Sequence, residues 1–192
     1  MILLVGFPKS GTSSFQSLFT KLGYKSIHQW SRSEGYVGML IKKNKTNNVP
    51  LLSGLEKYDS ITQLDVCKSI SENYWSQLID YKQLYYENKD SVIILNKRCP
   101  VKLLSSFKRW DNLDKRIYKY NPELIDNKTD EGFIAFVEKH YSDVEAFFNS
   151  IPEAKFIVYD IENDTIDKLT KYIDIKDISV FPKCNVNKKI DC

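Results

Sequence analysis

The sequence predicts an α/β protein of three layers, α/β/α, in which helices cover both faces of a central parallel sheet. Short apolar segments of strand length recur along the chain, and amphipathic segments of helix length lie between them. The two clearest strand segments, residues 91–96 (SVIILN) and 155–159 (KFIVY), are rich in β-branched and aromatic residues, as buried parallel strands are. Since the chain has 192 residues and no internal repeat, we expect one domain over residues 1–192.

The first half of the chain contains five expected segments. Residues 2–5 predict a strand, and residues 13–22 predict an amphipathic helix directly after a glycine-bounded loop. Alternation over residues 24–30 (YKSIHQW) indicates a short second strand. Residues 31–55 are polar, contain glycine and show little periodicity, so we expect a loop or a lid. Apolar residues at helical spacing predict one helix over residues 65–89.

The second half continues the alternation. The strand over residues 91–96 is followed by Pro100, which suits the first turn of a helix that we expect to reach about Tyr118. The remaining expected elements are a helix over residues 129–149, a strand over 155–159, a short helix over 165–173 and an irregular tail from Ile178.

Composition and charge exclude several classes of protein. A hydrophobic share of 42% is incompatible with a disordered chain. The net charge of +3 comes from scattered lysines rather than a basic stripe, so we do not expect nucleic acid as a partner. The apolar start MILLVGF is too short for a signal peptide or a membrane-spanning helix, which predicts a cytoplasmic protein without membrane insertion.

The cysteines give no sign of a metal site or a disulfide framework. None of them forms a CxxC pair, and without a secretory signal they are expected to be free thiols in a reducing compartment. These residues are Cys67, Cys99, Cys184 and Cys192.

Residues 5–14 (VGFPKSGTSS) are the most informative segment. A tight loop between a strand and the start of a helix is an anion cradle, because the N–H groups of the first helical turn and the helix dipole face a bound anion. The spacing between Gly6 and Gly11 is that of a Walker A loop, but Thr12 stands where the phosphate-binding lysine belongs. The lysine of this loop is Lys9, before the second glycine.

An ordinary NTPase is therefore one alternative rather than the leading interpretation. Ser13 could hold Mg²⁺ and Asp160, after a predicted strand, could imitate a Walker B acid. Thr12 does not fulfil the role of the Walker lysine, and an aspartate after a strand is usually a turn or helix cap. A purely structural glycine turn is the remaining alternative.

The segment FPKSGTSSF resembles the 5′-phosphosulfate-binding loop of the sulfotransferase family, whose donor is 3′-phosphoadenosine 5′-phosphosulfate (PAPS). In that family a second motif recognises the 3′-phosphate with an arginine that ends a buried strand and a serine eight residues later. Arg98 and Ser106 have this separation, in the segments SVIILNKR and CPVKLLSSFKRW. An arginine fork and a short hydroxyl suit one phosphate group.

Weaker similarities extend over much of the chain. Residues 58–65 (YDSITQLD) are similar to a Tyr-Asp-x-x-x-Asp stretch of small sulfotransferases, and residues 155–175 followed by FPKCN are similar to the closing segments of the family. The resemblance implies a P-loop NTPase-like sulfotransferase fold and a PAPS donor whose product is adenosine 3′,5′-bisphosphate (PAP). The implied donor-binding residues are Pro8, Lys9, Ser10, Gly11, Thr12, Ser13, Ser14, Arg98 and Ser106.

The resemblance also implies a mechanism. Sulfuryl transfer is an in-line displacement, and Lys9 with nearby backbone N–H groups would stabilise the charge on the leaving oxygen without a metal. The hydroxyls of Thr12, Ser13 and Ser14 would add contacts to the 5′-phosphate. Basic tail residues could close over the 3′-phosphate: Lys183, Lys188 and Lys189.

The general base is open between Glu34 and His28. Glu34 lies 25 residues after Lys9, in the region where many relatives carry a glutamate, and His28 lies on the expected second strand. Asp59 and Asp65 are further candidates, whereas His140, on an amphipathic helix, is expected to be structural.

The expected acceptor is a small molecule or glycan with a hydroxyl or amine. Two alternatives to a sulfotransferase stay open. One is a diverged kinase that uses Mg-ATP, and the other is a protein of the same fold that binds the nucleotide without turnover.

Overall fold

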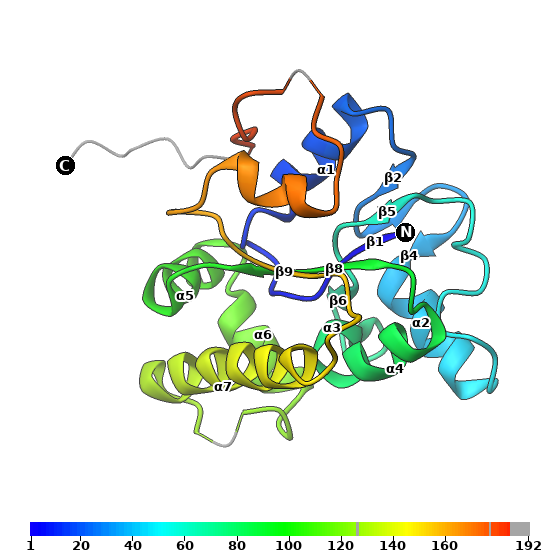
Figure 1. The fold of residues 1–192 in the computed structure, drawn as a ribbon. Helices are drawn as coiled ribbons and strands as arrows, with labels where there is room; N and C mark the ends of the chain where they lie inside the picture. Colours follow the sequence, from blue (N-terminus) through cyan, green and yellow to red (C-terminus); the bar gives the residue numbers. More distant parts are fainter. Residues whose placement is uncertain (126, 177, 185–192) are drawn as a thin grey trace.

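The computed structural model describes residues 1–125, 127–176 and 178–184. In this part of the chain a parallel sheet of five strands, in the order β2–β5–β1–β8–β9, lies between helices (Figure 1). The strands are β1 (Ile2–Leu4), β2 (Ser26–Ile27), β5 (Ser60–Ile61), β8 (Val92–Lys97) and β9 (Phe156–Asp160). The predicted α/β class and its central parallel sheet are confirmed.

Both faces of the sheet are covered. Alternate residues of the first strand point to opposite faces, so that Ile2 and Leu4 join one apolar cluster while Leu3 and Val5 join another. One face packs against α1 (Thr12–Lys21) and the 3₁₀ helix η1 (Ile166–Lys171). The opposite face packs against α2 (Val37–Thr46), α4 (Tyr81–Glu87), α5 (Pro100–Arg109), α6 (Leu113–Tyr120) and α7 (Asp130–Asn149).

The predicted loop over residues 31–55 is wrong in part, because this segment contains a helix. Strands β3 (Trp30–Ser31) and β4 (Gly35–Tyr36) pair as a small antiparallel hairpin, and α2 follows directly. Val37 and Ile41 are fully buried on one side of α2. The apolar residues of α2 are confined to its first five positions (VGMLI), which is too short a run to show helical periodicity, and the helix depends on packing in the buried cluster.

The single helix predicted over residues 65–89 is wrong. This segment forms the hairpin of β6 (Asp65–Cys67) and β7 (Asn73–Trp75), followed by the short helices α3 (Ser76–Ile79) and α4. Ile70, which the helical spacing placed on the apolar face, is 74% exposed in the turn. The polar sequence around it (KSISEN) favours a turn, because serine and asparagine side chains bind nearby backbone groups.

Four further features differ from expectation. The second strand is only two residues long, and the strand β5 beside it was not predicted. The helix from Pro100 divides into α5 and α6, since Asp111 and Asn112 adopt left-handed backbone conformations with φ of 51° and 49°. The predicted short helix near residue 170 is a 3₁₀ helix, η1.

The other elements agree closely with the predictions. The long helix α7 begins after Thr129, whose side chain accepts a hydrogen bond from Gly132 N at 3.1 Å. Within the described residues no helix is long and apolar enough to cross a membrane. Cys67, Cys99 and Cys184 are free thiols, and Cys192 lies outside the described residues.

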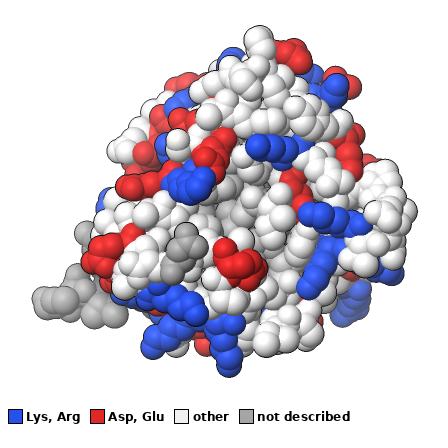
Figure 2. Space-filling model, turned by 90° about the horizontal axis from the view of Figure 1, so that it is seen from below, with Lys and Arg blue, Asp and Glu red and all other residues white. Residues whose placement is uncertain are grey.

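Charges of both signs are mixed on the surface. Figure 2 shows Lys and Arg side chains interspersed with Asp and Glu side chains over one face, without a continuous field of one sign. This distribution is the one expected from the scattered lysines in the sequence.

Candidate functional site

The loop after β1 is held by a buried asparagine of the neighbouring strand. Asn96, at the end of β8, is fully buried, and its Oδ1 accepts a hydrogen bond from Gly6 N at 3.0 Å. Its Nδ2 donates to Ser10 O at 3.0 Å and to Phe7 O at 3.4 Å. A Cβ on Gly6 would lie 2.2 Å from Asn96 O, so only glycine permits this approach. The loop is therefore fastened to the carboxyl edge of the sheet.

The loop backbone passes through two left-handed residues before the helix begins. Lys9 has φ of 67° and Gly11 has φ of 80°, and α1 starts at Thr12. A lysine in this region is uncommon, and such conformations concentrate at functional sites when the surroundings impose them. Here Lys9 O accepts a hydrogen bond from Arg98 Nη1 at 2.9 Å, which ties the loop to the residue after β8.

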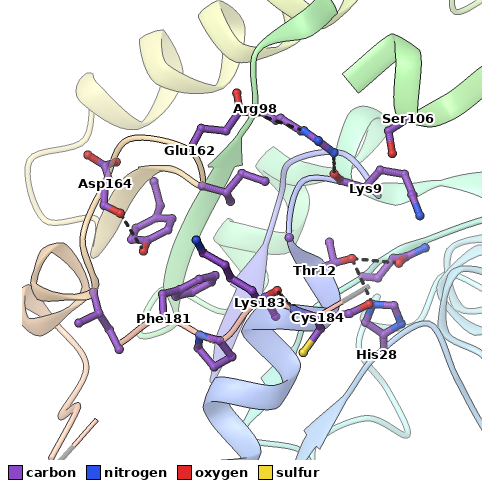
Figure 3. Close-up of a pocket in the computed structure, with 18 of the residues that line it drawn as sticks. Lys9, Thr12, His28, Arg98, Ser106, Glu162, Asp164, Phe181, Lys183 and Cys184 are labelled. Carbon is purple, nitrogen blue, oxygen red and sulfur yellow. Dashed lines mark hydrogen bonds and ion pairs between the residues drawn. The ribbon is translucent and has the colours of Figure 1, made fainter. Parts of the chain in front are cut away.

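A cavity of about 900 Å³ opens over this loop and the start of α1. Lys9, Arg98 and Ser106 all line it, although they come from the loop, from the end of β8 and from α5 (Figure 3). Gly11, Thr12, Ser13, Ser14 and His28 line the same cavity. Of the predicted donor-binding residues, Pro8 and Ser10 are buried and are not among the lining residues.

Lys9 lies in a positive environment. Its Nζ is 4.7 Å from the centroid of the Trp110 ring, and it has no ion-pair partner among the described residues. Burial lowers the pKa of Lys9, and the nearby charges of Arg98 and Arg109 lower it further. An ammonium group without a carboxylate beside it, next to two guanidinium groups, is suited to an anionic ligand.

Arg98 retains hydrogen-bonding capacity. Its side chain is 22% exposed, and its buried Nε has no hydrogen-bond partner among the described residues. Glu162 lies 3.9 Å from that nitrogen, beyond hydrogen-bond distance. Ser106 is 2% exposed and lines the same cavity from α5. Arg98 and Ser106 can bind one anion only if both reach the same cavity, and the structure meets this requirement.

His28 lines the cavity and contacts the start of α1. Its Nε2 is 3.1 Å from Thr12 Oγ1, and Thr12 Oγ1 donates to Gln63 Oε1 at 3.3 Å. Burial lowers the pKa of His28 to about 4, so the imidazole is neutral at physiological pH. A neutral imidazole in a cavity is a potential proton acceptor.

Glu34 has a different setting and is not among the cavity-lining residues. It lies in the β3–β4 turn, where its carboxylate pairs with Lys57 Nζ and accepts hydrogen bonds from three hydroxyls. The three hydroxyls belong to Ser31, Ser33 and, at 2.8 Å, Tyr58. These donors hold the pKa of Glu34 well below its usual range. The surroundings of Glu34 favour a structural anion, and those of His28 favour a base.

The other titratable candidates, Asp59, Asp65 and His140, are not among the cavity-lining residues. Asp59 accepts a hydrogen bond from Lys25 N at 2.7 Å, next to the sheet. Asp65 is buried on β6, 3% exposed, and is bonded to two glutamine side chains. His140 Nε2 is 2.8 Å from Val5 O and its ring packs against Phe7, in agreement with the structural role expected for it.

The C-terminal segment of the described chain, residues 179–184, forms the wall of the cavity next to α1 and β9. Phe181 lies against Phe15 and Tyr159, with ring centroids 4.9 and 5.2 Å apart, and Cys184 N donates to Ser14 Oγ at 3.0 Å. Lys183 lines the cavity, and Figure 3 shows it entering from this segment. Lys188 and Lys189 lie outside the described residues.

Several lining residues were not expected from the sequence, among them Arg109, Trp110 and Gln63. Arg109 comes three residues after Ser106, a spacing that places both on one face of a helix, so this arginine was detectable. Trp110 and Gln63 carried no comparable signal. Trp110 reaches the cavity from the residue directly after α5. Gln63 reaches it because it follows β5, which pairs with β1 next to the loop of Lys9.

Comparison with known proteins does not identify the chain, since no family model matches it and no curated protein matches its sequence. Among the described residues no cluster of three or more His, Cys, Asp or Glu side chains is suited to hold a metal ion. The site's own geometry therefore carries the functional argument.

Proposed function

We propose that this chain is a sulfotransferase that takes a sulfuryl group from PAPS and transfers it to a hydroxyl or amine. The observation that supports this most is the convergence of Lys9, Arg98 and Ser106 on one cavity. The two motifs are about ninety residues apart in the sequence and follow neighbouring parallel strands, so that one ligand with two anionic groups would reach both.

The fold offers further support for the finer class, a P-loop-like sulfotransferase fold. The connections after β1 and β8 leave on opposite faces of the sheet, through α1 and through α5 to α7. Neighbouring parallel strands whose connections diverge in this way leave a crevice at their carboxyl ends, and ligands of open α/β sheets bind there. The loop of Lys9 and the side chain of Arg98 lie at that crevice.

The residues present fit a nucleotide that carries two anionic groups. Arg98 Nε is buried without a hydrogen-bond partner in the described chain. Lys9 and Arg109 take part in no ion pair among the described residues. A cavity of about 900 Å³ lies within the range of roughly 300–1,000 Å³ typical of small-molecule sites. Lys9 with the start of α1 would hold the phosphosulfate end, and Arg98 with Ser106 the 3′-phosphate.

The donor supplies an activated sulfuryl group, and the chain supplies charge and a proton acceptor. The acceptor oxygen or nitrogen bonds to sulfur as the bond from sulfur to the phosphate oxygen breaks, and PAP leaves with the bond's electron pair. Lys9 and backbone N–H groups at the start of α1 stabilise the charge on that leaving oxygen. The acceptor's proton passes to His28, which is neutral at physiological pH.

One contact differs from the role that the resemblance implies. The hydrogen of the Thr12 hydroxyl is directed to Gln63 Oε1, so it is not available to a phosphate in this arrangement. Thr12 would contribute its backbone N–H instead. Asp160, the candidate Walker B acid, accepts hydrogen bonds from Glu162 N at 2.9 Å and Asn163 Nδ2 at 2.7 Å, as a turn cap does.

Calorimetric titration tests the proposal without knowledge of the acceptor. The protein is titrated with PAP in the presence of a chelator and, separately, with ATP and Mg²⁺. We expect PAP to bind tightly without metal and ATP to bind much more weakly. Binding of Mg-ATP alone would favour a kinase, and binding of neither would overturn the nucleotide site. Tight PAP binding without turnover over a broad acceptor panel would indicate an inactive nucleotide-binding protein.

A further inference from the structure

The cavity wall formed by Thr12, His28 and Gln63 contains a buried row of hydrogen-bonded polar side chains. It runs from Asp65 on β6 through Gln63 and Thr12 to His28. Asp65, Gln63 and Thr12 are 3%, 4% and 5% exposed, so water reaches these groups little and their hydrogen bonds must be satisfied by one another. Such a row restricts which atom carries each hydrogen.

The carboxyl of Asp65 determines the orientation of the glutamine amides. Gln63 Nε2 lies 3.1 Å from Asp65 Oδ2, and Gln77 Nε2 lies 2.9 Å from Asp65 Oδ1. Burial raises the pKa of Asp65 to about 7, so at pH 8 it is a carboxylate, and without an ion-pair partner in the described chain it is stabilised by these two NH₂ groups. If the Gln63 amide were flipped, its carbonyl oxygen would face a carboxylate oxygen, which is repulsive.

The orientation of Gln63 in turn determines the role of Thr12. With its nitrogen toward Asp65 and toward Gln29 Oε1, at 3.1 Å, Gln63 presents its oxygen to Thr12. An amide oxygen only accepts, so the Thr12 hydroxyl must donate its single hydrogen to it. Toward His28 the same hydroxyl can then only accept, and His28 Nε2 must carry the hydrogen.

We propose that Gln63 is a positioning residue, which through Thr12 holds His28 as the Nε2–H tautomer and leaves the Nδ1 lone pair as its proton acceptor. Nδ1 makes no hydrogen bond with the described residues, and His28 lines the cavity. The tautomer follows from the contacts alone. Its use as a base, in which Nδ1 takes the acceptor's proton and becomes N–H, rests on the proposed sulfotransferase activity.

The chain contains its own reference for this inference. It has two histidines, and His140 Nε2 lies 2.8 Å from Val5 O, a carbonyl that can only accept. His140 must therefore also be the Nε2–H tautomer, for a reason that does not involve Gln63. A spectrum of the ring nitrogens contains the signals of His28 and His140, and those of His140 are expected to be the same in every variant.

The test is long-range ¹H–¹⁵N correlation NMR of histidine-labelled protein at pH 8, without donor, where the imidazoles are neutral. We expect both histidines of the wild type to show the Nε2–H pattern. In Gln63→Met the Thr12 hydroxyl loses its acceptor and can donate to His28, so the Nδ1–H form of His28 becomes populated from an undetectable level. The His140 pattern should not change.

The matched control is Gln77→Met, which removes the other glutamine from Asp65 but leaves the contact between Gln63 and Thr12. It should leave His28 as in the wild type. A wild-type His28 in the Nδ1–H form would overturn the inference, even if the Gln63 variant did not fold. An unchanged His28 in Gln63→Met, or an equal change in Gln77→Met, would also overturn it. Titration with PAP tests the proposed function independently, so the two failures are distinguishable.

Discussion

Lys9 and Glu34 are two charged residues with opposite surroundings. Lys9 lies in a cavity with no ion-pair partner in the described chain, near the positive charges of Arg98 and Arg109. Glu34 lies in a surface hairpin where one ammonium group and three hydroxyls bind its carboxylate. The pKa of each group is lowered. For Lys9 this disfavours the charged ammonium form, whereas for Glu34 it favours the charged carboxylate form.

This difference makes Lys9 a candidate binding group and Glu34 a candidate structural one. A protein that holds a cation where its charge is disfavoured loses stability unless a ligand supplies the opposite charge. A carboxylate already bound by four donors has little capacity left to take up a proton. Lys9 is thus the stronger candidate for chemistry, although both residues were selected from the sequence on similar grounds.

The largest expected effect is that of Lys9→Ala on turnover. Removal of one group that stabilises the leaving oxygen lowers kcat by roughly 100- to 1,000-fold in comparable sites. PAP affinity should fall far less, because the charge on the leaving oxygen develops only in the transition state. The measurement is kcat with an acceptor from a screen, beside calorimetric PAP binding. Lys57→Ala, which removes the partner of Glu34, is the matched control, and comparable losses in both quantities would reduce Lys9 to a binding residue.

Arg98→Ala should weaken PAP binding by about 2–4 kcal/mol, roughly 30- to 1,000-fold, since it removes a part-buried charge-assisted contact. It should also abolish the preference for PAPS over adenosine 5′-phosphosulfate, which lacks the 3′-phosphate. Competition binding with the two compounds measures this preference. Arg32→Ala, in the exposed hairpin, is the control, and an unchanged preference in Arg98→Ala would refute the assignment of Arg98 and Ser106.

The histidines extend the comparison to groups that burial keeps neutral. The pKa of His140 is about 4 in the folded protein, against about 6.5 unfolded, so its stabilising effect is complete above pH 6.5 and is lost as the pH falls toward 4. His140→Gln keeps a donor for Val5 O and should reduce the loss of unfolding free energy between pH 7 and 4.5 by about 2–3 kcal/mol.

Urea denaturation of the wild type and of His140→Gln at both pH values measures this effect. The difference between the two proteins is the relevant quantity, because burial raises the pKa of Asp65 to about 7 and its contribution has the opposite sign. That contribution is complete below about pH 4 and is lost as the pH rises toward 7. Equal pH dependence in the two proteins would contradict the buried neutral state of His140.

The smallest effect is expected for Glu34→Gln. Turnover and PAP affinity should remain within about twofold of the wild type, as for a surface substitution away from the site. The same kinetic and calorimetric measurements apply, with Lys9→Ala as the positive control. A tenfold fall in turnover with unchanged PAP binding would restore Glu34 as the base and remove that role from His28.

Local patterns predicted the parts of the fold that have strong local signals. The strands β8 and β9 were clear from apolar runs, and the helix α7 was clear from helical periodicity. The hairpin β6–β7 and the helix α2 were not, because their short segments are stabilised by distant partners. The spacing of residues 65–89 imitated a helix, whereas the pairing of β6 with β7 and the exposure of Ile70 show a hairpin.

The sequence by itself determined the glycine-bounded loop with Lys9, the spacing of Arg98 and Ser106, and the two candidate bases. These follow from residue types at short spacings, which the covalent chain maintains. The tertiary structure decided which of them share a cavity, and it placed Gln63 and Arg109 there as well. It also separated His28 from Glu34, because Lys57 and Tyr58 beside Glu34 and the buried polar side chains behind His28 come from distant segments. Burial and hydrogen-bond partners are properties of the folded chain, and no spacing in the sequence encodes them.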